Sequence, residues 1–108
     1  MSSSACVIFF GVRYEPSDDE LEALEARSHP LMTAAREAGL KHYWANFGPR
    51  EEKYFLFLGT QIGIFGPENL VESATSADAL KSTVDATSEK LTKAAIPGVP
   101  NLWVQWLP

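Results

Sequence analysis

The sequence predicts an α+β domain in which two helices cover one face of a four-stranded antiparallel sheet. Three observations lead to this fold class. Short runs rich in β-branched and aromatic residues are typical of strands. Between them lie two longer segments whose apolar residues recur three and four positions apart, as in amphipathic helices. At 108 residues, the chain has room for a single domain spanning 1–108.

The first two elements are a strand and a helix. Residues 6–14 form an almost continuous apolar run, as expected of a central strand, and Glu15-Pro16 ends it. Ser17, followed by Glu20 three residues later, is a capping-box pattern that predicts a helix start. Proline lacks a backbone N–H and clashes with the preceding turn, so we expect either a kink near Pro30 or a new helix with Pro30 in its first turn.

A hairpin follows. Residues 40–47 alternate with a period of two, and residues 54–58 are apolar throughout, so both segments read as strands joined by the turn-rich connector 48–52. Between 59 and 74 the signals are mixed, with proline at the second position of a β-turn sequence at 66–69. The expectation for 59–74 is an extra hairpin or an ordered loop.

A second helix and a last strand complete the chain. Thr75 or Ser76 can cap a helix whose apolar stripe runs from Leu80 to Ala94 and ends before Pro97-Gly98. Residues 102–107 then form the final strand. The resulting βαββαβ order resembles the ferredoxin-like superfold over almost the full chain. Many ferredoxin-like domains pair sheet to sheet into dimeric α/β barrels with a cavity between the sheets, so the resemblance implies a homodimer.

Both halves of the strand alternation are rich in apolar residues, which is unusual for a sheet with one free face. We assign to the helix side Tyr43, Ala45, Phe47, Phe55, Phe57, Val104 and Trp106. The opposite face would then carry His42, Trp44, Asn46, Tyr54, Leu56, Leu58, Val7, Phe9, Arg13, Trp103 and Gln105. A bulge at Gly11 or Gly59 would exchange some members. An exposed apolar patch of this size marks an interaction site, and a second copy of the chain is the expected occupant.

A ligand site is expected in the cavity of that dimer. Its candidate binding residues are Arg13, His42, Trp44, Asn46, Tyr54 and Trp103. A cation, an imidazole and aromatic rings in an apolar wall favour a small aromatic or acidic ligand. His42 is the candidate acid or base if the protein is an enzyme, since its unperturbed pKa lies near neutrality. The alternative for His42 is a structural, hydrogen-bonded histidine.

Composition excludes several other classes. A net charge of −5 disfavours nucleic acid and anionic membranes as partners. No apolar run approaches the length of a membrane span, and the N-terminus lacks the basic region of a secretory signal, so we expect a cytoplasmic protein with Cys6 as a buried free thiol. His29, His42 and Cys6 have no metal-ligand spacing, and residues 59–66 lack the lysine of a phosphate loop. No metal or other cofactor is expected.

The alternative function is a protein-binding module, such as an inhibitor or an immunity protein. Six carboxylates that could dock a basic partner lie near the first helix: Glu15, Asp18, Asp19, Glu20, Glu22 and Glu25. Helix N-termini are also enriched in acids for dipole reasons, which explains the same cluster without a partner. His29 is expected at a surface break beside Pro30, and the alternative is a kink that places His29 near the edge of the sheet.

Overall fold

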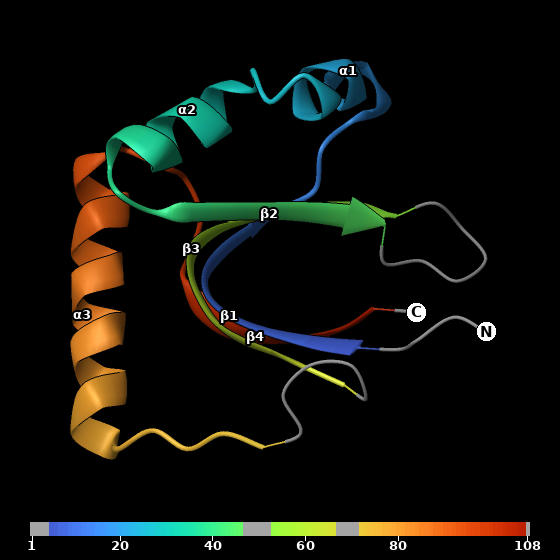
Figure 1. Ribbon diagram of the computed structural model, residues 1–108. Helices are drawn as coiled ribbons and strands as arrows, with labels where there is room; N and C mark the ends of the chain where they lie inside the picture. The colour runs from blue at the N-terminus through green and yellow to red at the C-terminus, as the bar shows by residue number, and fades with distance from the viewer. Residues whose placement is uncertain (1–4, 47–52, 67–71, 108) are drawn as a thin grey trace.

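A computed structural model describes residues 5–46, 53–66 and 72–107 (Figure 1). In chain order the elements are strand β1 (Ala5–Tyr14), a 3-10 turn η1 (Asp18–Glu20), helices α1 (Leu21–Glu25) and α2 (Pro30–Glu37), strands β2 (Lys41–Asn46) and β3 (Tyr54–Phe65), helix α3 (Ala77–Lys93) and strand β4 (Asn101–Leu107). The strands form one four-stranded antiparallel sheet in the order β2-β3-β1-β4. The predicted α+β class is confirmed.

The first crossover contains two short helices instead of one. The chain leaves α1 through Arg27, whose φ of 57° is left-handed. Pro30 is the first residue of α2, a position at which its missing N–H breaks no helical bond. His29 caps this helix, because its Nδ1 accepts a hydrogen bond of 3.1 Å from the N–H of Leu31. The predicted restart of the helix at Pro30 is therefore confirmed.

Strand β3 is longer than predicted. It continues through Gly59 to Phe65 and stays paired with β1, so the expectation of an extra hairpin or loop is wrong for residues 59–65. Pairing with a long central strand supplies hydrogen-bond partners that the mixed local signals do not reveal. The connector 48–52 and residues 67–69 of the β-turn sequence lie outside the described residues.

A bulge interrupts the pairing of β1 with β3, but not at either predicted glycine. Phe9 pairs with Gln61 and Ile8 pairs with Gly63, which makes Ile62 the extra residue. Gly11 and Gly59 instead face each other directly near the middle of their strands. Their φ angles of 156° and 154° and their very close backbones leave no room for a Cβ on either residue. Figure 1 shows that β1 and β3 curve strongly along their length, with α3 on the convex side.

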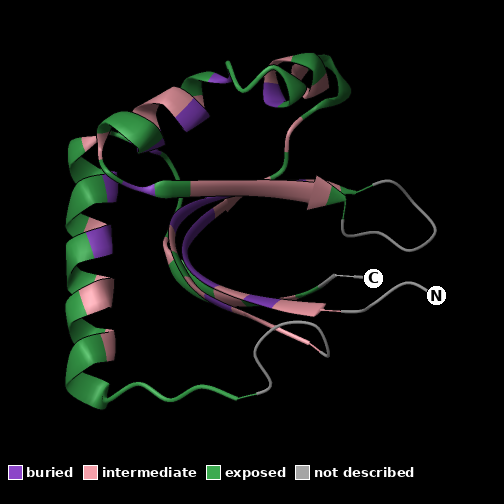
Figure 2. Cartoon of the chain, in the orientation of Figure 1, coloured by how far each residue is buried: buried purple, intermediate pink, exposed green. Residues whose placement is uncertain are grey.

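Helix α3 confirms its predicted cap and stripe. The Oγ atom of Ser76 accepts a hydrogen bond of 3.1 Å from the N–H of Ala79. Thr87 and Leu91 are buried against the sheet, and the outer face of the helix is exposed (Figure 2). The Thr87 hydroxyl lies 2.6 Å from the hydroxyl of Thr60 on β3, so this hydrogen bond ties the middle of α3 to the sheet.

Each face of the sheet carries its own apolar core. The core between sheet and helices is built by Val12, Leu24, Met32, Ala35, Leu40, Leu56, Leu58, Leu91 and Ile96. The concave face carries a second cluster of Val7, Phe9, Phe55 and Phe57, with Tyr43, Ala45, Ile64 and Trp103 packed against it. The curvature of the sheet lets residues of one face contact one another. The second aromatic face is therefore largely covered within a single chain.

The predicted face assignment is wrong for β2 and the first half of β3. Leu56, Leu58 and Trp44 pack toward the helices, whereas Phe55, Phe57, Tyr43 and Ala45 lie on the concave side. Val7, Phe9, Arg13, Trp103 and Gln105 lie on the concave face, as assigned. Because both sets of alternating residues in the hairpin are apolar, the local pattern contained no information on which set meets the helices.

Candidate functional site

The predicted site residues divide between the two faces of the sheet. His42 and Trp44 alternate on the helix side of the edge strand β2, and the Trp44 ring lies 5.7 Å from that of Tyr54. Asn46 ends the same strand, where its Oδ1 accepts a hydrogen bond of 3.1 Å from the N–H of Lys53. Arg13 and Trp103 are on the concave face instead. The structure therefore does not bring the six predicted residues together in one pocket.

Arg13 is part of the packing of the concave face. Its guanidinium carbon lies 4.1 Å from the ring centroid of Phe55 and 4.3 Å from that of Trp103. Its Nη1 donates a hydrogen bond of 3.0 Å to Oε1 of Gln105. The Trp103 indole N–H in turn donates to the carbonyl of Gly11 at 2.9 Å. A guanidinium held between two rings stabilises this core through cation–π contacts, so Arg13 is not the cation of the His42 site.

A different arginine lies beside His42. Arg27, His42, Tyr43 and Trp44 line a pocket with a volume of about 320 Å³ next to β2. Arg27 comes from the turn after α1, where the N–H of Ser28 bonds to the carbonyl of Ala23 at 2.8 Å. Such left-handed C-terminal turns favour glycine. Arg27 was not predicted from the sequence, and the helix break expected near Pro30 was the signal that residues just before it form a turn.

The surroundings of His42 are electropositive. Its pKa lies below the ordinary 6.5 because of burial first, and then because of the positive charges of Arg36, Arg27 and Lys41. The imidazole is therefore neutral at pH 7. In the described part of the chain, the ion pairs are those of His29 with Glu20, Lys81 with Asp85 and Lys93 with Glu89. The three cations around His42 have no carboxylate partner among these residues, although the chain as a whole is acidic.

A second polar cluster joins the end of β1 to the first crossover. The Glu20 carboxylate accepts hydrogen bonds from the Tyr14 hydroxyl at 2.7 and 2.8 Å and lies 2.5 Å from Nε2 of His29. It also accepts from the N–H and the hydroxyl of Ser17, both at 3.0 Å. The bond to His29 first, and then those to Ser17 and Tyr14, lower the pKa of Glu20 from 4.5 to about 2.

His29 has a structural role in this cluster. It is buried, so its expected surface position is wrong. Its Nδ1 accepts from the backbone of α2, which leaves Nε2 as the donor to Glu20. With both ring nitrogens engaged, His29 has no free position at which to transfer a proton to a substrate.

Replacing Ser17 by alanine is expected to lower the free energy of unfolding by about 1 kcal/mol. The substitution removes one hydrogen bond to Glu20, while the backbone N–H of residue 17 still donates to that carboxylate. Urea unfolding followed by circular dichroism measures the change. Ser82→Ala, on the exposed face of α3, is the control and should be nearly neutral. Equal midpoints for the two variants would contradict the role assigned to Ser17.

The apolar residues that predicted a dimer are mostly covered in one chain. Phe9, Leu56 and Leu58 have no exposed surface. Large apolar side chains are exposed instead at Val99, Leu102, Val104 and Trp106, on or next to the edge strand β4. The homodimer stays a prediction, but its expected interface no longer rests on the residues first assigned to it.

The acidic cluster is only partly available to a partner. Glu20 is turned inward, and the remaining members Glu15, Asp18, Asp19, Glu22 and Glu25 are exposed.

Cys6, expected to be buried, is half-buried. Among residues 5–46, 53–66 and 72–107, no group of three or more His, Cys, Asp or Glu side chains could hold a metal ion.

Comparison of the chain with models of protein families, with curated proteins and with solved structures gives no match. Within the described ranges, every helix is too short or too polar to cross a membrane.

Proposed function

We propose that the protein binds a small organic anion with an aromatic ring in the pocket beside β2. The observation that carries this proposal is the convergence of Arg27, His42 and Trp44 on one pocket, with no carboxylate among its described lining residues. A guanidinium binds a carboxylate or phosphate through two parallel hydrogen bonds, and the indole offers a flat surface for a ring. Binding, without catalysis, is the function that these groups support.

The position of Arg27 supports a functional role. A left-handed conformation costs a non-glycine residue roughly 1 kcal/mol, and glycine at this turn would remove that cost. The chain nevertheless has arginine there, with its side chain at the pocket. Local strain of this kind is frequent at binding sites, where the side chain compensates for it.

The test is the variant Arg27→Gly, which should raise the stability of the protein but abolish ligand binding. The variant should melt at a higher temperature than the wild type, because the turn relaxes. Its melting temperature should no longer rise with indole-3-acetate, benzoate or phenyl phosphate, which should stabilise the wild type in a concentration-dependent manner. Ala95→Gly is the matched control, since Ala95 has a φ of 54° at the end of α3, away from the pocket. It should gain stability and keep the ligand response.

Affinity should also depend on pH. A bound anion favours the protonated imidazole of His42, so binding should strengthen as the pH falls through the pKa of that group, which lies below 6.5 in the free protein. Replacing His42 by glutamine should flatten this dependence. Neutral analogues such as benzyl alcohol should not stabilise the protein. An equal response of the wild type and Arg27→Gly to the acids would contradict the proposed site.

We also propose that the fold is ferredoxin-like. Along the chain, one strand, a helical crossover, two strands, a helix and a last strand follow one another, and β1 and β3 occupy the centre of the sheet. The split βαβ arrangement of that superfold supports this assignment. The broken first crossover, with η1, α1 and α2 in place of one helix, is the departure from it.

A further inference from the structure

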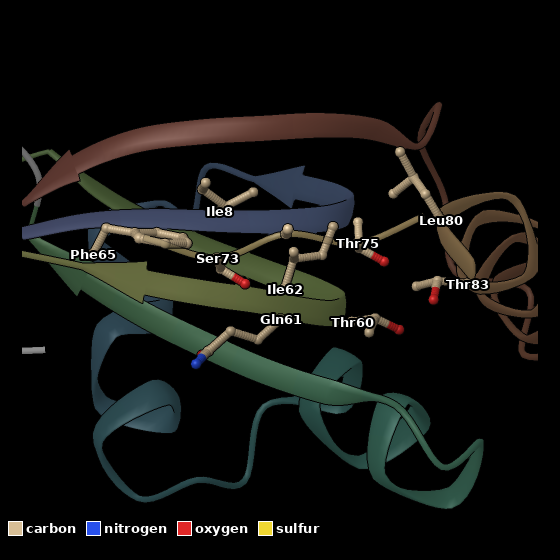
Figure 3. A pocket seen from close by; sticks show the side chains of 10 residues that line it. Ile8, Thr60, Gln61, Ile62, Phe65, Ser73, Thr75, Leu80 and Thr83 are labelled. Atoms are coloured by element: carbon tan, nitrogen blue, oxygen red, sulfur yellow. The ribbon is translucent and has the colours of Figure 1, made fainter. Parts of the chain in front are cut away.

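An open groove lies on the convex side of the sheet, at the end of α3 opposite the Arg27 pocket. It has a volume of about 360 Å³ and is lined by Ile8, Thr60, Gln61, Ile62, Phe65, Ser73, Ala74, Thr75, Leu80 and Thr83. Figure 3 shows Phe65, Ile8 and Ser73 toward one end, and Thr60, Thr75, Leu80 and Thr83 toward the end near the start of α3. None of these described lining residues is ionisable, in a chain with a net charge of −5.

The floor of the groove continues onto the exposed edge of the sheet. Ile8 pairs with Gly63 on one side and with Val104 on the other, so the three residues form one row across β3, β1 and β4. Gly63 has no side chain, and the ring of Phe65 lies over this position instead. Neighbouring strands lie about 4.8 Å apart, and Val104 therefore extends the apolar surface by roughly that length. Val104 is 65% exposed, so this extension is free in the single chain.

The hydroxyl groups along the groove can donate and accept hydrogen bonds without charge. The hydroxyl of Thr83 donates to the carbonyl of Ala79 at 3.1 Å, and that of Thr60 pairs with Thr87 at 2.6 Å. In the part of the chain that the structure describes, the hydroxyls of Ser73 and Thr75 make no hydrogen bond within the protein and are exposed. They remain available to a ligand headgroup, and the apolar row leads away from them.

We propose that this groove binds an elongated neutral amphiphile, with a hydroxyl or amide head near Ser73 and Thr75 and an apolar chain along Ile8 toward Val104. The uncharged lining favours an uncharged ligand, because a buried charge without a partner is costly. The apolar row from Ile8 to Val104, which leads away from the Ser73 hydroxyl, selects a chain-like molecule over a compact one. This site is independent of the anion pocket beside β2.

The test is displacement of the neutral fluorescent probe N-phenyl-1-naphthylamine. The wild type should bind the probe, and 1-decanol should displace it at least tenfold more effectively than decanoate. Val104→Lys should weaken decanol binding at least fivefold by ending the apolar row with a charge. Val99→Lys is the matched control, because Val99 is 77% exposed and does not line the groove. It should bind decanol like the wild type, and so should His42→Gln.

Two outcomes would overturn the proposal. One is decanol binding that is the same in Val104→Lys and Val99→Lys, with both variants shown to be folded by circular dichroism. The other is a wild type that sediments as a dimer and binds no probe, combined with a monomeric Val104→Lys. That result would mean that a second copy, and not an amphiphile, covers this edge.

Discussion

Replacing Gly59 by alanine is expected to destabilise the folded protein strongly. A Cβ at this position would lie 2.2 Å from the carbonyl oxygen of Phe10, and one at Gly11 would lie 2.1 Å from that of Leu58. Both contacts are with backbone atoms in the centre of the sheet, which cannot move without breaking the pairing of β1 with β3. We expect a loss of about 3 kcal/mol or more for either substitution. Urea unfolding and near-ultraviolet circular dichroism measure it.

Gly39→Ala separates the steric clash from backbone strain. Gly39 has a φ of 77°, but the nearest atom to a Cβ there is Nζ of Lys90 at 3.8 Å. Only the left-handed backbone opposes this substitution, at about 1 kcal/mol. Equal stability of Gly59→Ala and Gly39→Ala would contradict the close approach of β1 and β3 at Gly11 and Gly59.

Replacing Glu20 by glutamine is expected to lower the free energy of unfolding at pH 7 by about 2 kcal/mol. The carboxylate accepts from Tyr14, Ser17 and His29, whereas the glutamine amide has one oxygen and a donor group that faces these donors. This loss is smaller than the full pKa shift implies, because the Glu20 side chain is 28% exposed and water screens its interactions. Urea unfolding of both proteins at a series of pH values measures the loss.

The sign of the pH dependence follows from the lowered pKa. The folded-state pKa of Glu20 is about 2, against an ordinary 4.5, so its stabilisation is fully present above pH 4.5 and is lost as the pH falls toward 2. The difference between wild type and Glu20→Gln should shrink across that window. Glu25→Gln, at an exposed position of α1, should show no such difference. A constant difference from pH 6 to pH 2 would contradict the assignment.

Hydrogen exchange offers an independent view of the same cluster. Glu20 holds η1 to Tyr14 and to His29, and His29 caps α2. In Glu20→Gln, the amides of α1 and α2 should therefore exchange faster through local opening. The exchange rates of the α3 amides should rise only as far as the loss of global stability requires.

The sequence by itself determined the helix ends that depend on contacts between residues a few positions apart in the chain. Ser76 caps α3 and Pro30 opens α2 because a side-chain oxygen or a missing N–H acts on the nearest backbone groups. The apolar runs likewise located the strands, apart from the continuation of β3 to Phe65, which depends on a partner strand far along the chain.

Only the tertiary structure decided which residues share a face or a pocket. Trp44 and Tyr43 are both compatible with a core, and the packing of α2 and α3 on the sheet selects Trp44 for the helix side. The same selection separates Arg13 from His42 and places Arg27 beside it. The physical reason is that alternation fixes which residues of a strand point the same way, while the free energy that chooses between its two sides comes from contacts with segments distant in sequence.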